Sequence, residues 1–186
     1  MLRLWILIGV VVVLAIVAIL GYNRLVRLRN EVKTGWSNID VQLQRRADLI
    51  PNLVETVRGY AAHERGVFDE VTKARTALQQ AGSPASAAQA DAGLTTALGR
   101  LFAVAEAYPD LKASDNFKEL QEELTDTEDK ISAARRYYNA TVMSFNNAVQ
   151  SFPWVLFARS LGFREREFFS AEGDLAPPQV SFATGS

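Results

Sequence analysis

The sequence contains no cysteine and a single histidine among its 186 residues. Without cysteine, the chain can form neither a disulfide framework nor a thiolate metal site. Because His63 is the one histidine, most His-based zinc and di-iron sites are excluded, and a Ser/His/Asp triad would depend on that residue alone. His63 stands beside Glu64 and Arg65 in a polar stretch, which indicates a surface position. We therefore expect no cofactor.

Neither sign of charge is in clear excess, since the chain has 20 Lys and Arg and 21 Asp and Glu. A net charge of -1 gives no global attraction to nucleic acid, so no nucleic-acid partner is expected. The length allows one globular domain with an appendage and leaves no room for a large two-domain enzyme. The sequence also lacks a phosphate-binding glycine loop and a G-x-S-x-G elbow, so we expect no enzymatic activity.

A long apolar run stands at the amino terminus. No charged or polar side chain occurs from Leu4 to Leu20, and Gly21 and Tyr22 extend the run to a length of roughly 28 Å as a helix. The hydrocarbon core of a bilayer is ~30 Å thick. The sequence therefore predicts a transmembrane anchor in residues 1–22, with residues 4–22 in the lipid bilayer. A cleaved signal peptide is the alternative, although the run is long for one and a cleavage site near Ala18 or Gly21 is poor.

The cations that flank this run predict its orientation. Only Arg3 and the amino terminus precede the run, whereas Arg24, Arg27, Arg29 and Lys33 follow it. The positive-inside rule favours an amino terminus outside and a cytoplasmic body. The same cations could contact anionic headgroups, but topology alone explains them.

The rest of the chain shows apolar residues at alternating spacings of three and four. This period of 3.5 is typical of helices that cross with a left-handed twist, as in antiparallel bundles. No stretch alternates with the period of two that marks a half-buried strand, so no sheet is expected. We predict an all-α fold: the transmembrane helix followed by an antiparallel up-and-down four-helix bundle over residues 23–172. The apolar seams run over residues 36–78, 94–108 and 117–152, and only Arg46 and Glu64 interrupt the first.

The breaks between helices are marked by turn residues. Gly82, Ser83 and Pro84 offer a helix stop, an N-cap and a first-turn proline in succession. Residues 109–114 form the next connection, with Ser114 or Asp115 as N-cap. Residues 173–186 lack periodicity and predict a flexible tail.

Pro51 allows two interpretations. Either residues 23–80 form one kinked helix, because the heptad frame continues through the proline, or the chain reverses there into two helices of matched length. If the helix is continuous, its membrane-proximal half lacks a partner in this chain, which predicts pairing with another copy and hence a homo-oligomer. Around the proline, Arg46 is expected to pair with a carboxylate, and Asn52 or Asp48 to satisfy the backbone groups that Pro51 frees. The alternative is a partner-binding notch formed by Arg45, Arg46, Asp48, Pro51 and Asn52.

Two features lie near the carboxy terminus. Residues 154–163 predict a short apolar helix, which either covers an open end of the bundle or contacts a membrane or partner through Trp154 and Phe157. On the preceding helix, the hydroxyl of Tyr138 lies in the seam and needs a hydrogen-bond partner. Asn139, Asn146 and Asn147 either bridge helices or contact a ligand.

An acidic run covers residues 119–129. Glu122, Asp126 and Asp129 share one helical face and could hold a hard cation, which would suit a metal-dependent enzyme. Lys118 and Lys130 lie among these acids, and a solvated charged face is the simpler interpretation.

Several long segments resemble the LemA family of bacterial membrane proteins, from the anchor to about Glu172. The most specific are RRADLIPNL, LQEELTDTEDKI and RRYYNATVMSFN, and the chain departs from the family mainly in its Ala-rich link over residues 85–93. The resemblance implies a single-pass inner-membrane protein with a helical-bundle body, no established enzymatic activity and no catalytic residues to carry over. Its magnetosome- and envelope-associated relatives, and a link to membrane protein quality control, imply a scaffold or adaptor for membrane or envelope proteins. The alternatives are a membrane-shaping or lipid-contacting protein and a metal-dependent enzyme.

Overall fold

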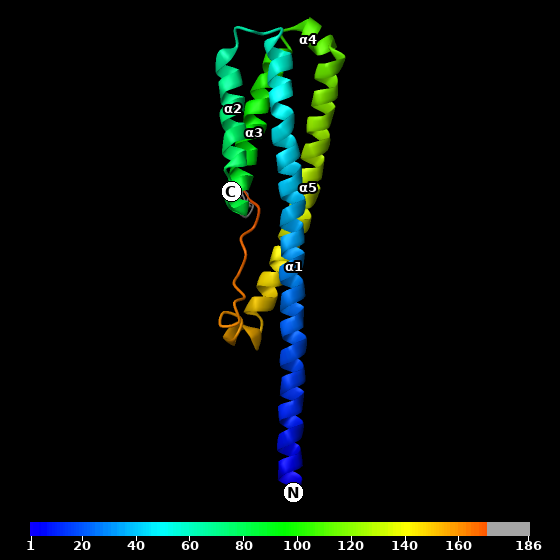
Figure 1. Cartoon of the computed structure of the whole chain (residues 1–186), viewed down its shortest axis with the longest axis vertical. Coiled ribbons are helices and arrows are strands. Elements are labelled where there is room, and N and C mark those ends of the chain that lie inside the picture. The colour runs from blue at the N-terminus through cyan, green and yellow to red at the C-terminus, as the bar shows by residue number, and fades with distance from the viewer. Residues whose placement is uncertain (171–186) are drawn as a thin grey trace, which may run out of the picture. The chain divides into compact units, whose positions relative to one another are not determined.

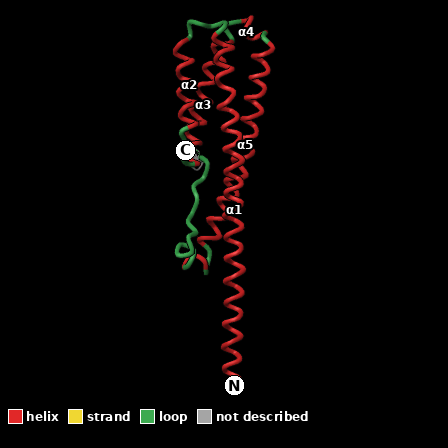
Figure 2. Tube along the Cα trace, in the orientation of Figure 1, coloured by secondary structure: helices red, strands yellow, loops and turns green. Residues whose placement is uncertain are grey.

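The computed structural model describes residues 1–170, and all of its regular structure is helical. The helices are α1 (Leu2–Arg58), α2 (Arg65–Gln79), α3 (Pro84–Ala105), α4 (Pro109–Ala113) and α5 (Asp115–Gln150), followed by the 3-10 turn η1 (Trp154–Leu156) (Figure 1). No strand occurs within the described residues (Figure 2). The predicted all-α fold is confirmed. The tail predicted over residues 173–186 lies outside the described residues.

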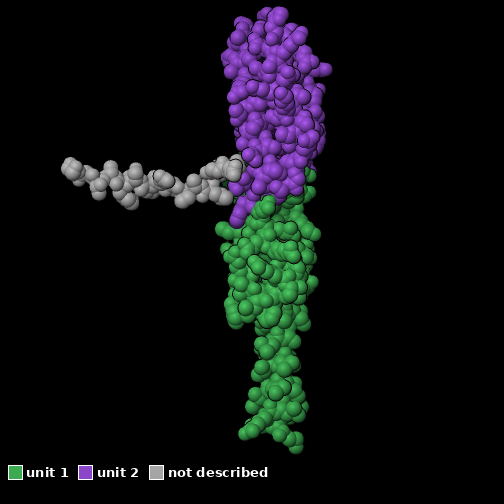
Figure 3. Space-filling model, turned by 90° about the vertical axis from the view of Figure 1, so that its left-hand side faces the viewer, with its two compact units in different colours: residues 1–40, 132–167 green, residues 41–131, 168–186 purple. Residues whose placement is uncertain are grey.

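The chain divides into two compact units, which Figure 3 distinguishes by colour. Unit 1 contains residues 1–40 and 132–167, and unit 2 contains residues 41–131 together with the chain from Phe168 onward. Both α1 and α5 contribute residues to each unit. The boundaries predicted at residues 22 and 172 separate the anchor from the body and the body from the tail. These boundaries stay a prediction.

Unit 2 contains the up-and-down helical arrangement. Here α2 and α3 lie side by side with the last part of α1 and the first part of α5 (Figure 1). The predicted seams form its core, in which Leu53 of α1, Val71 of α2 and Leu101 of α3 have no accessible surface. Phe102 and Phe117 meet edge to face, with ring centroids 6.2 Å apart. Period-3.5 patterning therefore identified the buried face of each helix.

Unit 1 pairs the amino-terminal part of α1 with the second half of α5. Leu25, Val32 and Ile39 of α1 are buried, as are Tyr138 and Phe145 of α5. The two backbones approach closely at Gly35, where a Cβ atom would lie 3.3 Å from the Tyr138 Cα. The expectation that a continuous helix would leave this half of α1 without a partner in the chain is wrong, because α5 covers it. Self-association stays a prediction that no longer follows from an uncovered helix.

Neither interpretation of Pro51 was fully right. The helix α1 runs through the proline without a break, yet it ends at Arg58 instead of reaching residue 80. The chain reverses over residues 59–64, where the amides of Tyr60 and Ala61 both bond to the Val57 carbonyl. Gly59 follows the last helical residue without a positive φ, so it does not form the left-handed cap that glycine often makes at a helix end. The apolar spacing of the sequence continues across this turn and so gave no sign of it. Tyr60, which the spacing placed in the buried seam, is 47% exposed.

The carbonyl that Pro51 frees is satisfied by another helix. Proline has no N–H for the Ala47 oxygen, and that oxygen instead accepts a 2.8 Å hydrogen bond from Nε of Arg75 on α2. The prediction that Asn52 or Asp48 satisfies the freed group is wrong for this carbonyl, and the Asp48 carboxylate instead accepts a bond from the Gln44 amide. Because Ala47 is buried, the missing bond would otherwise leave an acceptor away from water.

The predicted cap of α3 is confirmed. The Ser83 hydroxyl accepts a bond from the Ser86 amide at 3.2 Å, and the Ser86 hydroxyl accepts one from the Ser83 amide at 3.0 Å. Pro84 occupies the first turn. This reciprocal pair satisfies two amides at the start of the helix and fixes where α3 begins.

Replacing Arg75 should show how much stability the chain loses when the carbonyl freed by Pro51 has no donor. We expect Arg75→Met to lower the free energy of unfolding by about 1–3 kcal/mol, because the Ala47 carbonyl then lacks a donor. Chemical denaturation followed by circular dichroism in detergent measures this, with Lys73→Met on the exposed side of α2 as the matched control.

A Pro51→Ala background tests the cause directly. Alanine supplies an amide to the Ala47 oxygen, so Arg75→Met should cost clearly less in that background than in the natural chain. An equal loss in both backgrounds would show that Arg75 acts through something other than this carbonyl.

Candidate functional site

Arg46 is the most deeply buried charged residue in unit 2, with 2% of its surface exposed. Its Nη1 lies 2.8 Å from Oδ1 of Asp91 on α3, and its Nη2 donates to the Thr95 hydroxyl at 3.0 Å and lies 3.5 Å from Glu128 of α5. The predicted pairing of Arg46 with a carboxylate is confirmed. This guanidinium therefore joins three helices within unit 2.

The other residues of the predicted notch face outward. Arg45, Asp48, Pro51 and Asn52 are all exposed on α1. Arg45 lies 3.5 Å from Asp126 of α5, so it contributes to the surface charge network. The structure thus separates buried Arg46 from the other four, which line one side of α1 and form no enclosed notch with it.

An acid of the run over residues 119–129 forms an ion pair with the lysine that follows the run. The Lys130 ammonium donates to Asp126 at 2.7 Å, and this hydrogen bond holds the pKa of that carboxyl below its usual value, with Arg45 adding a weaker attraction. Within residues 1–170, no group of three or more His, Cys, Asp and Glu side chains is arranged to hold a metal ion. His63 is exposed in the turn after α1, as predicted.

In unit 1, the polar and aromatic residues of α5 hold the returning chain. The Tyr138 hydroxyl donates to the Glu167 carbonyl at 2.8 Å, which supplies the partner that the sequence required. Burial raises the pKa of Tyr138 to about 12. Asn146 both donates to the Arg166 carbonyl and accepts from its amide, at 2.9 and 2.8 Å. Asn146 therefore anchors a segment of the backbone, and Asn139 is half-buried on the same helix.

The segment that follows α5 is a compact loop, which we call the aromatic loop and define as residues 151–163. The prediction of a short helix is wrong here, because only Trp154–Leu156 is regular, as one 3-10 turn. The buried side chains of Ala158 and Phe163 cover the α1–α5 pair, while Val155, Leu156 and Phe157 are exposed. Phe152 was expected to close the seam, but it is 82% exposed because α5 ends at Gln150.

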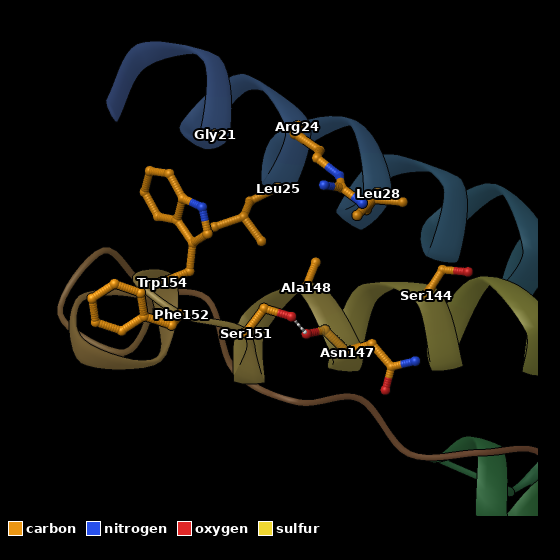
Figure 4. A pocket seen from close by; sticks show the side chains of 10 residues that line it. All are labelled: Gly21, Arg24, Leu25, Leu28, Ser144, Asn147, Ala148, Ser151, Phe152 and Trp154. Atoms are coloured by element: carbon orange, nitrogen blue, oxygen red, sulfur yellow. Dashed lines mark hydrogen bonds between the residues drawn. The ribbon is translucent and has the colours of Figure 1, made fainter. Parts of the chain in front are cut away.

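Trp154 fixes this loop against α1. Its indole lies directly on Gly21, where a Cβ atom would overlap the ring (Figure 4). Tyr22 meets Phe163 edge to face at 5.5 Å between centroids, and the Arg29 guanidinium lies 5.3 Å from the centre of the Phe163 ring. Glycine at position 21 is therefore a packing requirement, which the sequence signalled only as the end of an apolar run.

A cavity of about 480 Å³ lies beside this contact. Its walls combine the aromatic faces of the loop with polar side chains of α5 and the cation Arg24, as Figure 4 shows. The cavity suits a group with one polar and one apolar end, and its lining has no acid, base and nucleophile set for catalysis. Of this lining, sequence reasoning had proposed a contact role for Trp154 and Asn147 and, as an alternative to topology alone, a headgroup contact for Arg24. The lining residues are Gly21, Arg24, Leu25, Leu28, Ser144, Asn147, Ala148, Ser151, Phe152 and Trp154.

Removing one partner of the buried ion pair should be costly. We expect Asp91→Ala to lower the free energy of unfolding by about 3 kcal/mol, because it leaves the Arg46 guanidinium buried without its nearest carboxylate. Glu128→Ala should cost less than about 1 kcal/mol, since this carboxylate is largely exposed. Denaturation of the two variants under identical conditions measures the difference. Equal losses would show that Asp91 has no special part in holding Arg46.

Comparison with known proteins places these features in a family. Residues 35–182 match the LemA family. The magnetosome protein MamQ of Magnetospirillum gryphiswaldense is 30% identical over 87% of this chain and 71% of its own length. MamQ 2 of Paramagnetospirillum magneticum is 31% identical over 86% of this chain and 70% of its own. Protein LemA of Metamycoplasma hominis is 29% identical over 70% of this chain and 60% of its own. The chain belongs to the LemA family.

Proposed function

We propose that this chain is a single-pass membrane protein whose helical body acts as a non-catalytic scaffold or adaptor for other membrane or envelope proteins. The observation that carries the proposal is the double character of α1. Its most apolar stretch has a mean hydropathy of 3.1, and none of that stretch is buried. The helix is long and apolar enough to cross a bilayer. The same helix then continues into a packed helical body.

The retained anchor is supported by the aromatic loop. Cleavage near Ala18 or Gly21 would remove or disrupt the surface on which Trp154 packs. Residues 24–33 carry four cations directly after the apolar stretch, which favours an amino terminus outside and a cytoplasmic body at a bacterial inner membrane. The similarity to proteins named as magnetosome proteins supports a bacterial setting for this location.

The adaptor role is supported by what the exposed surface offers. The outward side chains of α1 at Arg45, Asp48 and Asn52 are polar and accessible, and they lie on a rigid helix. Rigid elements position a recognition surface better than loops do. The names of the relatives carry no enzymatic activity, and a link to membrane protein quality control remains part of the proposal. The metal-dependent alternative has less support, because Asp126 is bonded to Lys130.

In-cell crosslinking tests the adaptor role. A photo-crosslinking amino acid at Asp48 or Asn52 should give the same discrete adducts in the membrane fraction, because both positions lie on one exposed side of α1. The matched control is Thr76 on α2, which is also exposed and should give a different pattern or none.

The oligomeric state of the purified full chain completes this test. Adducts with a second copy would identify a homo-oligomer, and adducts with another membrane protein would identify an adaptor. A strictly monomeric protein in detergent that forms no adduct in cells from any position would overturn the proposal.

A further inference from the structure

The aromatic loop exposes an unusual amount of apolar surface. Phe152 is 82% exposed, Leu156 65%, Phe157 53%, Val155 51% and Leu161 46%. Single exposed apolar residues are common on protein surfaces, whereas several within one short loop mark an interaction site. These side chains project from a segment in which Ala158 and Phe163 are buried and Trp154 packs on Gly21. The loop is therefore held in place while its apolar side chains face outward.

The position of the loop along α1 indicates what it meets. The contact between Trp154 and Gly21 places the loop beside the residue at which the apolar stretch of α1 ends (Figure 4). The edge-to-face contact of Phe163 with Tyr22 holds the loop at the same position along α1. If Leu4–Leu20 lie in the hydrocarbon, Gly21 and Tyr22 lie at the interface between lipid and water. Tryptophan and tyrosine are enriched at that interface, where one end of the ring is apolar and the other wet.

The charges around the loop complement a lipid surface. Arg159 and Arg164 belong to or adjoin the loop, and Arg24 lines the neighbouring cavity. Glu165 is the nearest acid in sequence and lines a second cavity together with Arg159 and Arg164. Cations therefore outnumber acids on this part of unit 1, an arrangement that suits anionic phospholipid headgroups above an apolar layer.

We propose that the aromatic loop is a second membrane contact, which inserts Phe152, Leu156 and Phe157 into the interfacial layer of an anionic bilayer at the point where α1 leaves it. Arg159 and Arg164 then lie among the headgroup phosphates. The proposal rests on the proposed function, because it requires α1 to span the membrane. A second protein copy or another partner on the same surface is the competing occupant. Continuity with the apolar stretch favours lipid.

The absence of cysteine makes a direct depth measurement clean. A single cysteine at Leu156 of the full chain carries a spin label, and the chain is reconstituted into vesicles of phosphatidylcholine and phosphatidylglycerol. Collision with lipid-soluble oxygen is compared with collision with a water-soluble nickel complex. The matched controls are labels at Leu14, within the apolar stretch, and at Ala133, exposed on α5 in the same unit.

The proposal predicts that the ratio of oxygen to nickel collision rates is about threefold or more higher for the label at Leu156 than for the label at Ala133, as expected for a residue in the interfacial layer. A water-exposed Leu156 label combined with a lipid-exposed Leu14 label would overturn this inference and leave the anchor intact. Water exposure at both positions would overturn the anchor as well. Protection of the Leu156 label from both reagents would show that protein covers the loop, and would also overturn the inference.

A charge variant distinguishes insertion from mere proximity. With the label moved to Val155, the change Leu156→Asp with Phe157→Asp should transfer that label from lipid to water, since carboxylates resist entry into the interface. Both residues are exposed, so the body should keep its circular dichroism spectrum. An unchanged oxygen preference in this variant would contradict insertion through these side chains.

Discussion

One helix changes character along its length, from apolar on every side to apolar on one buried stripe, and the rest of the structure depends on that change. The first part of α1 exposes apolar side chains on all sides, a pattern that suits lipid, whereas from Leu25 onward the helix buries one stripe against protein. The change occurs within a turn, at Gly21, Tyr22 and Arg24. There the aromatic loop packs on the helix, and the first cations after the apolar run appear. This transition is thus also the place where the carboxy-terminal part of the chain returns to α1.

Much of the fold was predictable because buried faces leave a regular pattern. The seams of period 3.5, the Ser83 cap and the carboxylate partner of Arg46 all follow from local sequence and the cost of burying unsatisfied groups. The misses have two causes: a tertiary contact at Pro51 and an accident of the pattern at the turn that follows α1. Pro51 stays within a helix because Arg75 reaches its freed carbonyl from another element, and no local signal announces that donor. The turn at residues 59–64 was hidden because the heptad frame happens to continue across it.

The candidate site shows the same division. Trp154 and Phe157 could be singled out from an aromatic cluster beside arginines, yet their separate roles depend on packing: Trp154 lies on Gly21, whereas Phe157 faces outward. Asn146 looked equally suited to a ligand, but it bonds the backbone of Arg166 on both edges of its amide. The buried polar groups of the described residues thus hold the fold together, and the exposed apolar side chains of the aromatic loop form the surface that we propose to contact lipid.

The central claim is that α1 continues as one helix from the lipid into the folded body. Its most direct test is a distance measurement by electron–electron double resonance between spin labels at Leu14 and Ser37, both exposed on α1 within unit 1. In nanodiscs, an unbroken helix predicts a single narrow distribution centred at about 34 Å, from a rise of 1.5 Å per residue. A broad distribution, or a distinctly shorter mean, would show a hinge where the helix leaves the membrane and would contradict the account.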